Sequence, residues 1–137
     1  MTQIRLLTLL LSLVVRASAE HDLQMVAWMK TINQSIDSLR EMEKKTGPKA
    51  VALAERLGAA YEEMIGYWRQ HGAPDAVKVS ADGKAAAIVL AAAAYRGEEA
   101  QAAESIQKIG ATCRPCHAAW RETTSTGKHR VKQRELK

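Results

Sequence analysis

AAESIQKIGATCRPCHAAW, residues 102–120, is the stretch of sequence that decides the fold. Its apolar positions recur after three or four residues, which is the period of an amphipathic helix. One face of that helix carries Ala102, Ile106, Ile109, Cys113, Cys116 and Trp120. The pattern predicts a helix from about Glu98 to Thr124 that turns both cysteines of the chain toward a core.

Three more helices are predicted upstream by the same period. The first extends from about Asp22 to Lys45, with the apolar stripe Met25, Met29, Ile32, Ile36, Leu39 and Met42. The second extends from Pro48, which suits a first helical turn, to about His71, with the stripe Ala54, Leu57, Tyr61, Met64 and Trp68. The third extends from about Asp75 to Arg96 and ends at Gly97, and a break near Asp82 is the alternative because Gly83 weakens it.

The fold class follows from these helices and from the segments between them. The connections are short, contain glycine and proline, and favour antiparallel neighbours. Aromatic residues make up only 4% of the chain, alanine is abundant, and no segment after residue 19 alternates like a strand. We therefore predict an all-α protein without strands, folded as an antiparallel up-down-up-down four-helix bundle.

The N-terminal residues predict export. Residues 1–19 have a basic start, a short apolar run and the small residues Ala17-Ser18-Ala19, which is typical of a signal peptide cut after Ala19. The apolar run is too short to span a bilayer, although Arg16 leaves an uncleaved amphipathic anchor as the alternative. We expect a periplasmic protein with a bundle domain over 20–126 and a basic, disordered tail over 127–137.

The charge of the chain excludes one class of partner. The formal net charge is +5, and without Arg5 and Arg16 it is +3, which is too small to indicate nucleic-acid binding. The basic side chains of the tail are Lys128, Arg130, Lys132, Arg134 and Lys137. Such a run is typical of a solvated chain end, and a docking surface for acidic partners is the alternative.

Cys113 and Cys116 are the only cysteines, and His117 follows them directly. Three uses of this motif fit the chain poorly. A thioredoxin-type dithiol lies at a helix start after a strand, where the thiol pKa is depressed. A structural zinc ion needs four ligands, and the sequence offers little beyond these three. A disulfide across two residues is strained and crosslinks very little chain.

The fourth use, covalent attachment of a c-type haem, fits best. Two thiols add to the two vinyl groups of the porphyrin, and the adjacent imidazole binds the iron. Such attachment takes place outside the cytoplasm, in agreement with the predicted export. The sequence therefore predicts one haem c, bonded through Cys113 and Cys116, with His117 as the proximal metal ligand.

With this motif the chain resembles the cytochrome c-prime family of periplasmic four-helix-bundle cytochromes. The resemblance lies in IGATCRPCHAAWR (109–121) and, toward a related b-type bundle cytochrome, in WMKTINQSIDSL (28–39). It covers the helical layout and implies that Met29 binds the iron in a low-spin His/Met site. It also implies that Arg121 pairs with a haem propionate, for which the alternative is a solvated surface arginine.

Helix geometry gives an independent comparison of the residues that could be the sixth iron ligand. In an antiparallel bundle Met29 and His117 both lie about 10 Å from the same end, at a rise of 1.5 Å per residue. Met64 is the serious rival, Met25 lies one turn nearer the end, and Met42 lies at the far end. His21 and His71, at helix ends, would reach the iron only with distortion. Methionine is also common in protein cores. The remaining alternative is therefore that none of these methionines binds the iron.

The predicted function is electron transfer rather than enzyme catalysis. A His/Met iron is six-coordinate and leaves no position for a substrate, and the chain has no evident distal His/Arg pair for peroxidase chemistry. The alternative is a five-coordinate, high-spin cytochrome c-prime that binds NO or CO. A non-haem helical protein with a dithiol or a metal is a third class. The expected partners are redox proteins, acidic ones among them, and the chain is a monomer or a homodimer.

Overall fold

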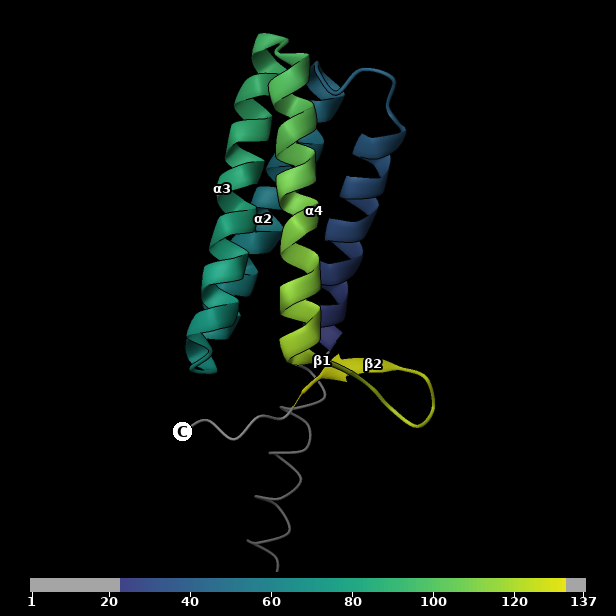
Figure 1. The fold of residues 1–137 in the computed structure, drawn as a ribbon, viewed down its shortest axis with the longest axis vertical. Helices are drawn as coiled ribbons and strands as arrows, with labels where there is room; N and C mark the ends of the chain where they lie inside the picture. The colour runs from purple at the N-terminus through teal and green to yellow at the C-terminus, as the bar shows by residue number, and fades with distance from the viewer. Residues whose placement is uncertain (1–22, 133–137) are drawn as a thin grey trace, which may run out of the picture.

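The computed structural model describes residues 23–132, which form four helices followed by a short β-hairpin (Figure 1). The first helix spans 23–41, and α2 (Pro48–Gln70), α3 (Pro74–Arg96) and α4 (Glu99–Trp120) follow it. Consecutive helices run in opposite directions and pack against one another, so the predicted all-α four-helix bundle is confirmed. The predicted signal peptide, 1–19, lies outside the described residues.

Proline and glycine set most of the helix ends. Pro48 and Pro74 each occupy a first helical turn, and Gly97 follows α3 in the left-handed region with φ 74°. The first helix ends at residue 41, four residues before the predicted end. After this end the Lys45 ammonium group donates to the carbonyl oxygen of Arg40 at 2.7 Å, which satisfies one of the last carbonyl groups of the helix. None of the helices over 23–132 is long and apolar enough to cross a bilayer.

The core is filled by aliphatic side chains and alanines. Its fully buried large residues are Leu39, Leu57, Leu90 and Ile109, one from each helix. Helices α2 and α3 approach closely where Gly83 faces the ring of Tyr61: a Cβ atom on Gly83 would lie 2.5 Å from the ring carbon Cζ. α3 is continuous there, so the alternative of a break near Asp82 is wrong.

The chain after α4 departs from the prediction. α4 ends at Trp120 instead of Thr124, and two three-residue strands follow, β1 (Arg121–Thr123) and β2 (His129–Val131). The strands are antiparallel, and a turn connects them in which Gly127 has φ 78°. β-branched threonines favour extended backbone, and a glycine with positive φ is typical of a tight turn.

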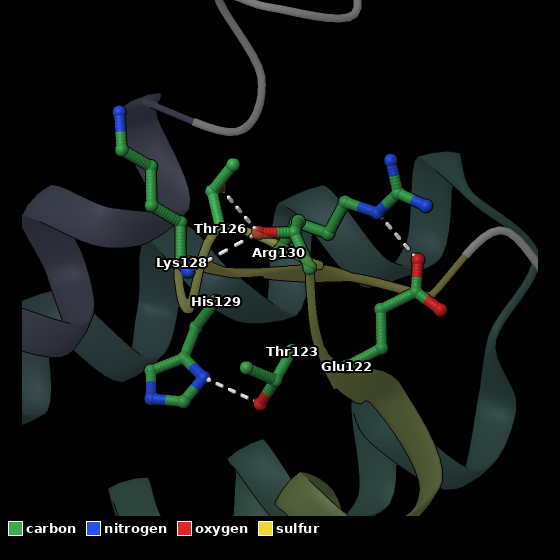
Figure 2. Close-up of polar contacts among 7 residues, drawn as sticks. Glu122, Thr123, Thr126, Lys128, His129 and Arg130 are labelled. Atoms are coloured by element: carbon green, nitrogen blue, oxygen red, sulfur yellow. Dashed lines mark hydrogen bonds and ion pairs between the residues drawn. The ribbon is translucent and has the colours of Figure 1, made fainter.

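This hairpin corrects two predictions. The chain does contain strands, and the residues from Gly127 to Lys132 are part of the hairpin instead of a disordered tail. The backbone N–H of Lys132 donates to the carbonyl oxygen of Trp120 at 2.7 Å, which ties the second strand to the end of α4. Figure 2 shows the side-chain contacts that join the two strands. Residues 133–137 of the predicted tail lie outside the described range.

Candidate functional site

A cavity of about 410 Å³ lies where the first helix, α2, α4 and the hairpin meet. Its buried lining is apolar and consists of Met25, Met64, Trp68 and Trp120. Its exposed lining is mostly polar and consists of Val26, Lys30, Asn33, Gln34, Asp37, Arg121, His129 and Arg130. The cavity is therefore apolar inside and mostly polar where solvent reaches it, and its volume is within the range of cofactor sites.

The Cys-x-x-Cys-His motif lies in the wall of this space. Cys116 and His117 line the larger cavity, and Cys113 lines an adjoining cavity of about 30 Å³ to which the other two also contribute. Spacings of three and four residues bring these positions to one side of α4. Both thiols are free and half-buried. One bound group can therefore meet all three side chains.

Burial disfavours the charged forms of Cys116 and His117. It raises the pKa of the Cys116 thiol to about 11, and the negative charges of Asp75 and Cys113 act in the same direction. Burial also lowers the pKa of His117, with the charges of Arg121 and His129 as further causes. A neutral imidazole is the form that binds a metal, so the surroundings of His117 favour its ligating state.

Two methionines reach both cavities. Met29 comes from the first helix and is half-buried, whereas Met64 comes from α2 and is only 2% exposed. Met25 lines the larger cavity, and Met42 lines neither. Met29 and Met64 therefore both line the space that His117 lines.

His71, just after the end of α2, does not enter this space. The ring of His71 stacks on the ring of Tyr67 with centroids 4.0 Å apart, and its Nδ1 lies 2.7 Å from the carbonyl oxygen of Tyr67. His71 lines neither cavity. His21 lies outside the described residues.

Aromatic side chains hold the apolar wall in place. The rings of Trp68 and Trp120 are 4.9 Å apart, and the indole N–H of Trp120 donates to the carboxylate of Asp75 at 3.1 Å. Tyr61 lines the smaller cavity, and its hydroxyl lies 3.3 Å from Oγ1 of Thr112, next to the motif. Packed rings form this wall, and the buried indole N–H of Trp68 has no hydrogen-bond partner among the described residues.

The hairpin contributes a side of the cavity that the sequence did not predict. Arg121, a predicted site residue, lines the cavity from β1, and the strand β2 adds His129, Arg130 and Val131. The run of threonine, serine and glycine over 123–127 is a turn signal that could have indicated the hairpin. The polar residues of the first helix were missed because they lie beside, not on, its apolar stripe.

The residues present fit a covalently attached haem. The donor set combines two free thiols, a neutral imidazole and two thioethers around an apolar space, with polar side chains at its open side. Within residues 23–132, no three His, Cys, Asp or Glu side chains form a group that could hold a metal ion alone. A haem iron requires only one or two protein ligands, because the porphyrin supplies the others.

Compared with family models, curated proteins and solved structures, the chain matches none of them. The chemistry of the cavity and its lining residues is therefore the basis for a function.

Proposed function

We propose that the protein is an exported electron carrier of the cytochrome c-prime type with one haem c. Cys113 and Cys116 would hold the haem through thioether bonds, and His117 and Met29 would be the protein ligands of its iron. When bound, the haem supplies a one-electron ferric/ferrous couple. The observation that carries the proposal is the cavity of about 410 Å³, because Cys116, His117 and Met29 all line it.

The residues around the cavity suit this role. Trp68 and Trp120 are almost fully buried, so they exclude water from the apolar side. A thioether ligand to the iron favours the ferrous state compared with a second imidazole. Arg121 lines the same cavity from β1 and would pair with a carboxylate of the haem. A wall of packed rings changes little between two redox states, and this favours rapid outer-sphere transfer.

The first experiment tests attachment. The full chain is produced in a host with haem-attachment machinery, and its mass and acid-acetone extract are measured. We expect the mass of the polypeptide plus one haem, no extractable porphyrin, and loss of the adduct in the variant Cys113→Ser/Cys116→Ser. A chain that carries no haem in this host contradicts the proposal.

The second experiment tests the sixth ligand with a matched pair of variants. Met29→Ala and Met64→Ala each remove one thioether from the same two cavities. We expect a low-spin spectrum that becomes high-spin in Met29→Ala and stays low-spin in Met64→Ala. The reverse pattern assigns Met64 instead. A high-spin spectrum of the unaltered protein favours the five-coordinate alternative that binds NO or CO.

A further inference from the structure

We propose that the β1–β2 hairpin is the carboxylate-binding wall of the cavity, with His129 donating a hydrogen bond from Nε2 to a carboxylate of the bound porphyrin. The inference rests on the proposed function, since it assumes that a porphyrin occupies the cavity. It assigns a role to an element that the haem-attachment motif does not include.

The register of the hairpin determines which side chains can face the cavity. Thr123 pairs with His129, and Arg121 pairs with Val131. Directly opposite residues of an antiparallel pair lie on the same face, and residues two apart along a strand share it. These four side chains therefore share one face of the hairpin, and three of them line the cavity: Arg121, His129 and Val131. Arg130 also lines the cavity, although its side chain starts from the other face.

Thr123 fixes the ring of His129. Its Oγ1 lies 3.1 Å from Nδ1 of His129, and Figure 2 shows Nε2 on the other side of the ring, turned away from Thr123. When the threonine hydroxyl donates to Nδ1, the ring proton is on Nε2. His129 can then donate from Nε2 to a carboxylate. No residue within 23–132 accepts a hydrogen bond from Nε2.

The charges around the cavity favour an acidic ligand. Lys30, Arg121 and Arg130 contribute cationic groups to the lining, and Asp37 is its one acid within the described residues. The guanidinium of Arg130 is paired with Glu122 on the opposite face of the hairpin, as Figure 2 shows. The donors left on the cavity-facing side of the hairpin are thus Arg121 and His129.

Contacts at both of its ends keep the hairpin in place. The N–H of Lys132 binds the end of α4, and at the turn the N–H of Thr124 donates to the carbonyl of Lys128 at 2.7 Å. The N–H of Lys128 in turn donates to Oγ1 of Thr124 at 3.1 Å. A porphyrin dicarboxylate has an apolar ring and a polar edge. The cavity has the same division, with its apolar wall on the helices and its donors on the hairpin.

The test uses full-length chain produced without haem attachment, titrated with iron-free protoporphyrin IX and with its dimethyl ester. Binding is followed by quenching of tryptophan fluorescence. We expect the protein to bind the free acid more tightly than the ester, because only the acid has carboxylates. His129→Ala should reduce this preference about tenfold with little effect on binding of the ester, which corresponds to one hydrogen bond to a charged group.

Two variants serve as controls. Lys128→Ala removes a cation from the same hairpin without touching the cavity lining, and it should leave the preference unchanged. Thr123→Val removes the hydroxyl that orients the ring, and it should reduce the preference by less than His129→Ala. Equal effects of His129→Ala and Lys128→Ala would mean that charge alone acts, and this contradicts the inference. Equal binding of acid and ester by the unaltered protein contradicts it as well.

The outcomes separate this inference from the proposed function. Iron-free porphyrin needs neither thioether bonds nor an iron ligand, so the titration does not depend on attachment. A His129-dependent preference in a chain that never acquires haem supports the carboxylate site and contradicts the electron carrier. If the haem is attached and the preference for the free acid does not depend on His129, the electron carrier is supported and the carboxylate site is contradicted. A chain that binds neither porphyrin contradicts the carboxylate site, and the attachment experiment decides the electron carrier separately.

Discussion

The two halves of the bundle are built from the same four helices but packed differently. In the half that contains the connection 42–47 and Gly97, Leu39, Leu57 and Leu90 are fully buried. In the other half, methionines and tryptophans surround a cavity of about 410 Å³. The first half makes the fold stable, and the second half gives up packing to leave room for a ligand.

The largest expected effect tests this contrast directly. Leu57→Ala should lower the free energy of unfolding by about 2–5 kcal/mol, because it opens a cavity in a closely packed region. Met64→Ala is the matched variant in the open half, where the side chain already borders empty space. It should cost less in the haem-free chain. Urea unfolding of both variants measures the difference, and equal losses would contradict the division into halves.

Tyr61 lies at the boundary of the halves and makes stability depend on pH. Burial raises the pKa of its hydroxyl from 10.0 to about 12. The neutral phenol is thus favoured in the folded state, so its contribution is complete below pH 10 and is lost as the pH rises from 10 to 12. The haem-free protein should lose about 2 kcal/mol more than Tyr61→Phe over this range. Unfolding in urea at several pH values checks this, and parallel curves for the two proteins would exclude the effect.

Gly83→Ala should break the close approach of α2 and α3 at the same boundary. The new Cβ atom would lie 2.5 Å from the ring of Tyr61, and overpacking of this kind costs about 1–3 kcal/mol, of which the better helix propensity of alanine offsets up to about 1. Gly58→Ala is the control, because a Cβ there meets nothing within 4 Å. It should raise the melting temperature while Gly83→Ala lowers it. Two variants that shift alike would remove the steric explanation.

The smallest effect concerns the ion pair of the hairpin. Glu122 and Arg130 are both substantially exposed, and exposed pairs contribute about 0–1 kcal/mol. Glu122→Gln should therefore change the free energy of unfolding of the bundle by less than about 0.5 kcal/mol. Thermal unfolding at low and high salt checks this. A large loss would mean that the hairpin, and not the packed half, stabilises the helices.

The helices could be predicted because each has a strong period of apolar residues and a distinct end. Pro48, Pro74 and Gly97 act through backbone geometry that is local to them, so their positions alone indicate helix ends. Tyr61 and Gly83 illustrate the limit. Gly83 weakens the predicted third helix, and only the packed bundle reveals that it makes room for a ring from α2.

The candidate site was predictable where it depends on the motif and unpredictable where it depends on tertiary structure. Spacing alone brings Cys113, Cys116 and His117 together. The contribution of His129 depends on a hairpin whose strands are three residues long, too short to produce an alternating pattern. Met29 and Met64 carry equal local signals, and both reach the cavity, so packing does not choose between them.

The tie between Lys132 and the end of α4 has a consequence for how the molecule can vary. All fully buried core residues among those described come from the helices and their connections, with Val131 packed against them from β2, while the cavity gains one whole side from the eleven or so residues after Trp120. Sequence changes in that segment can therefore alter ligand preference while the scaffold persists, much as an interchangeable loop does on a rigid framework.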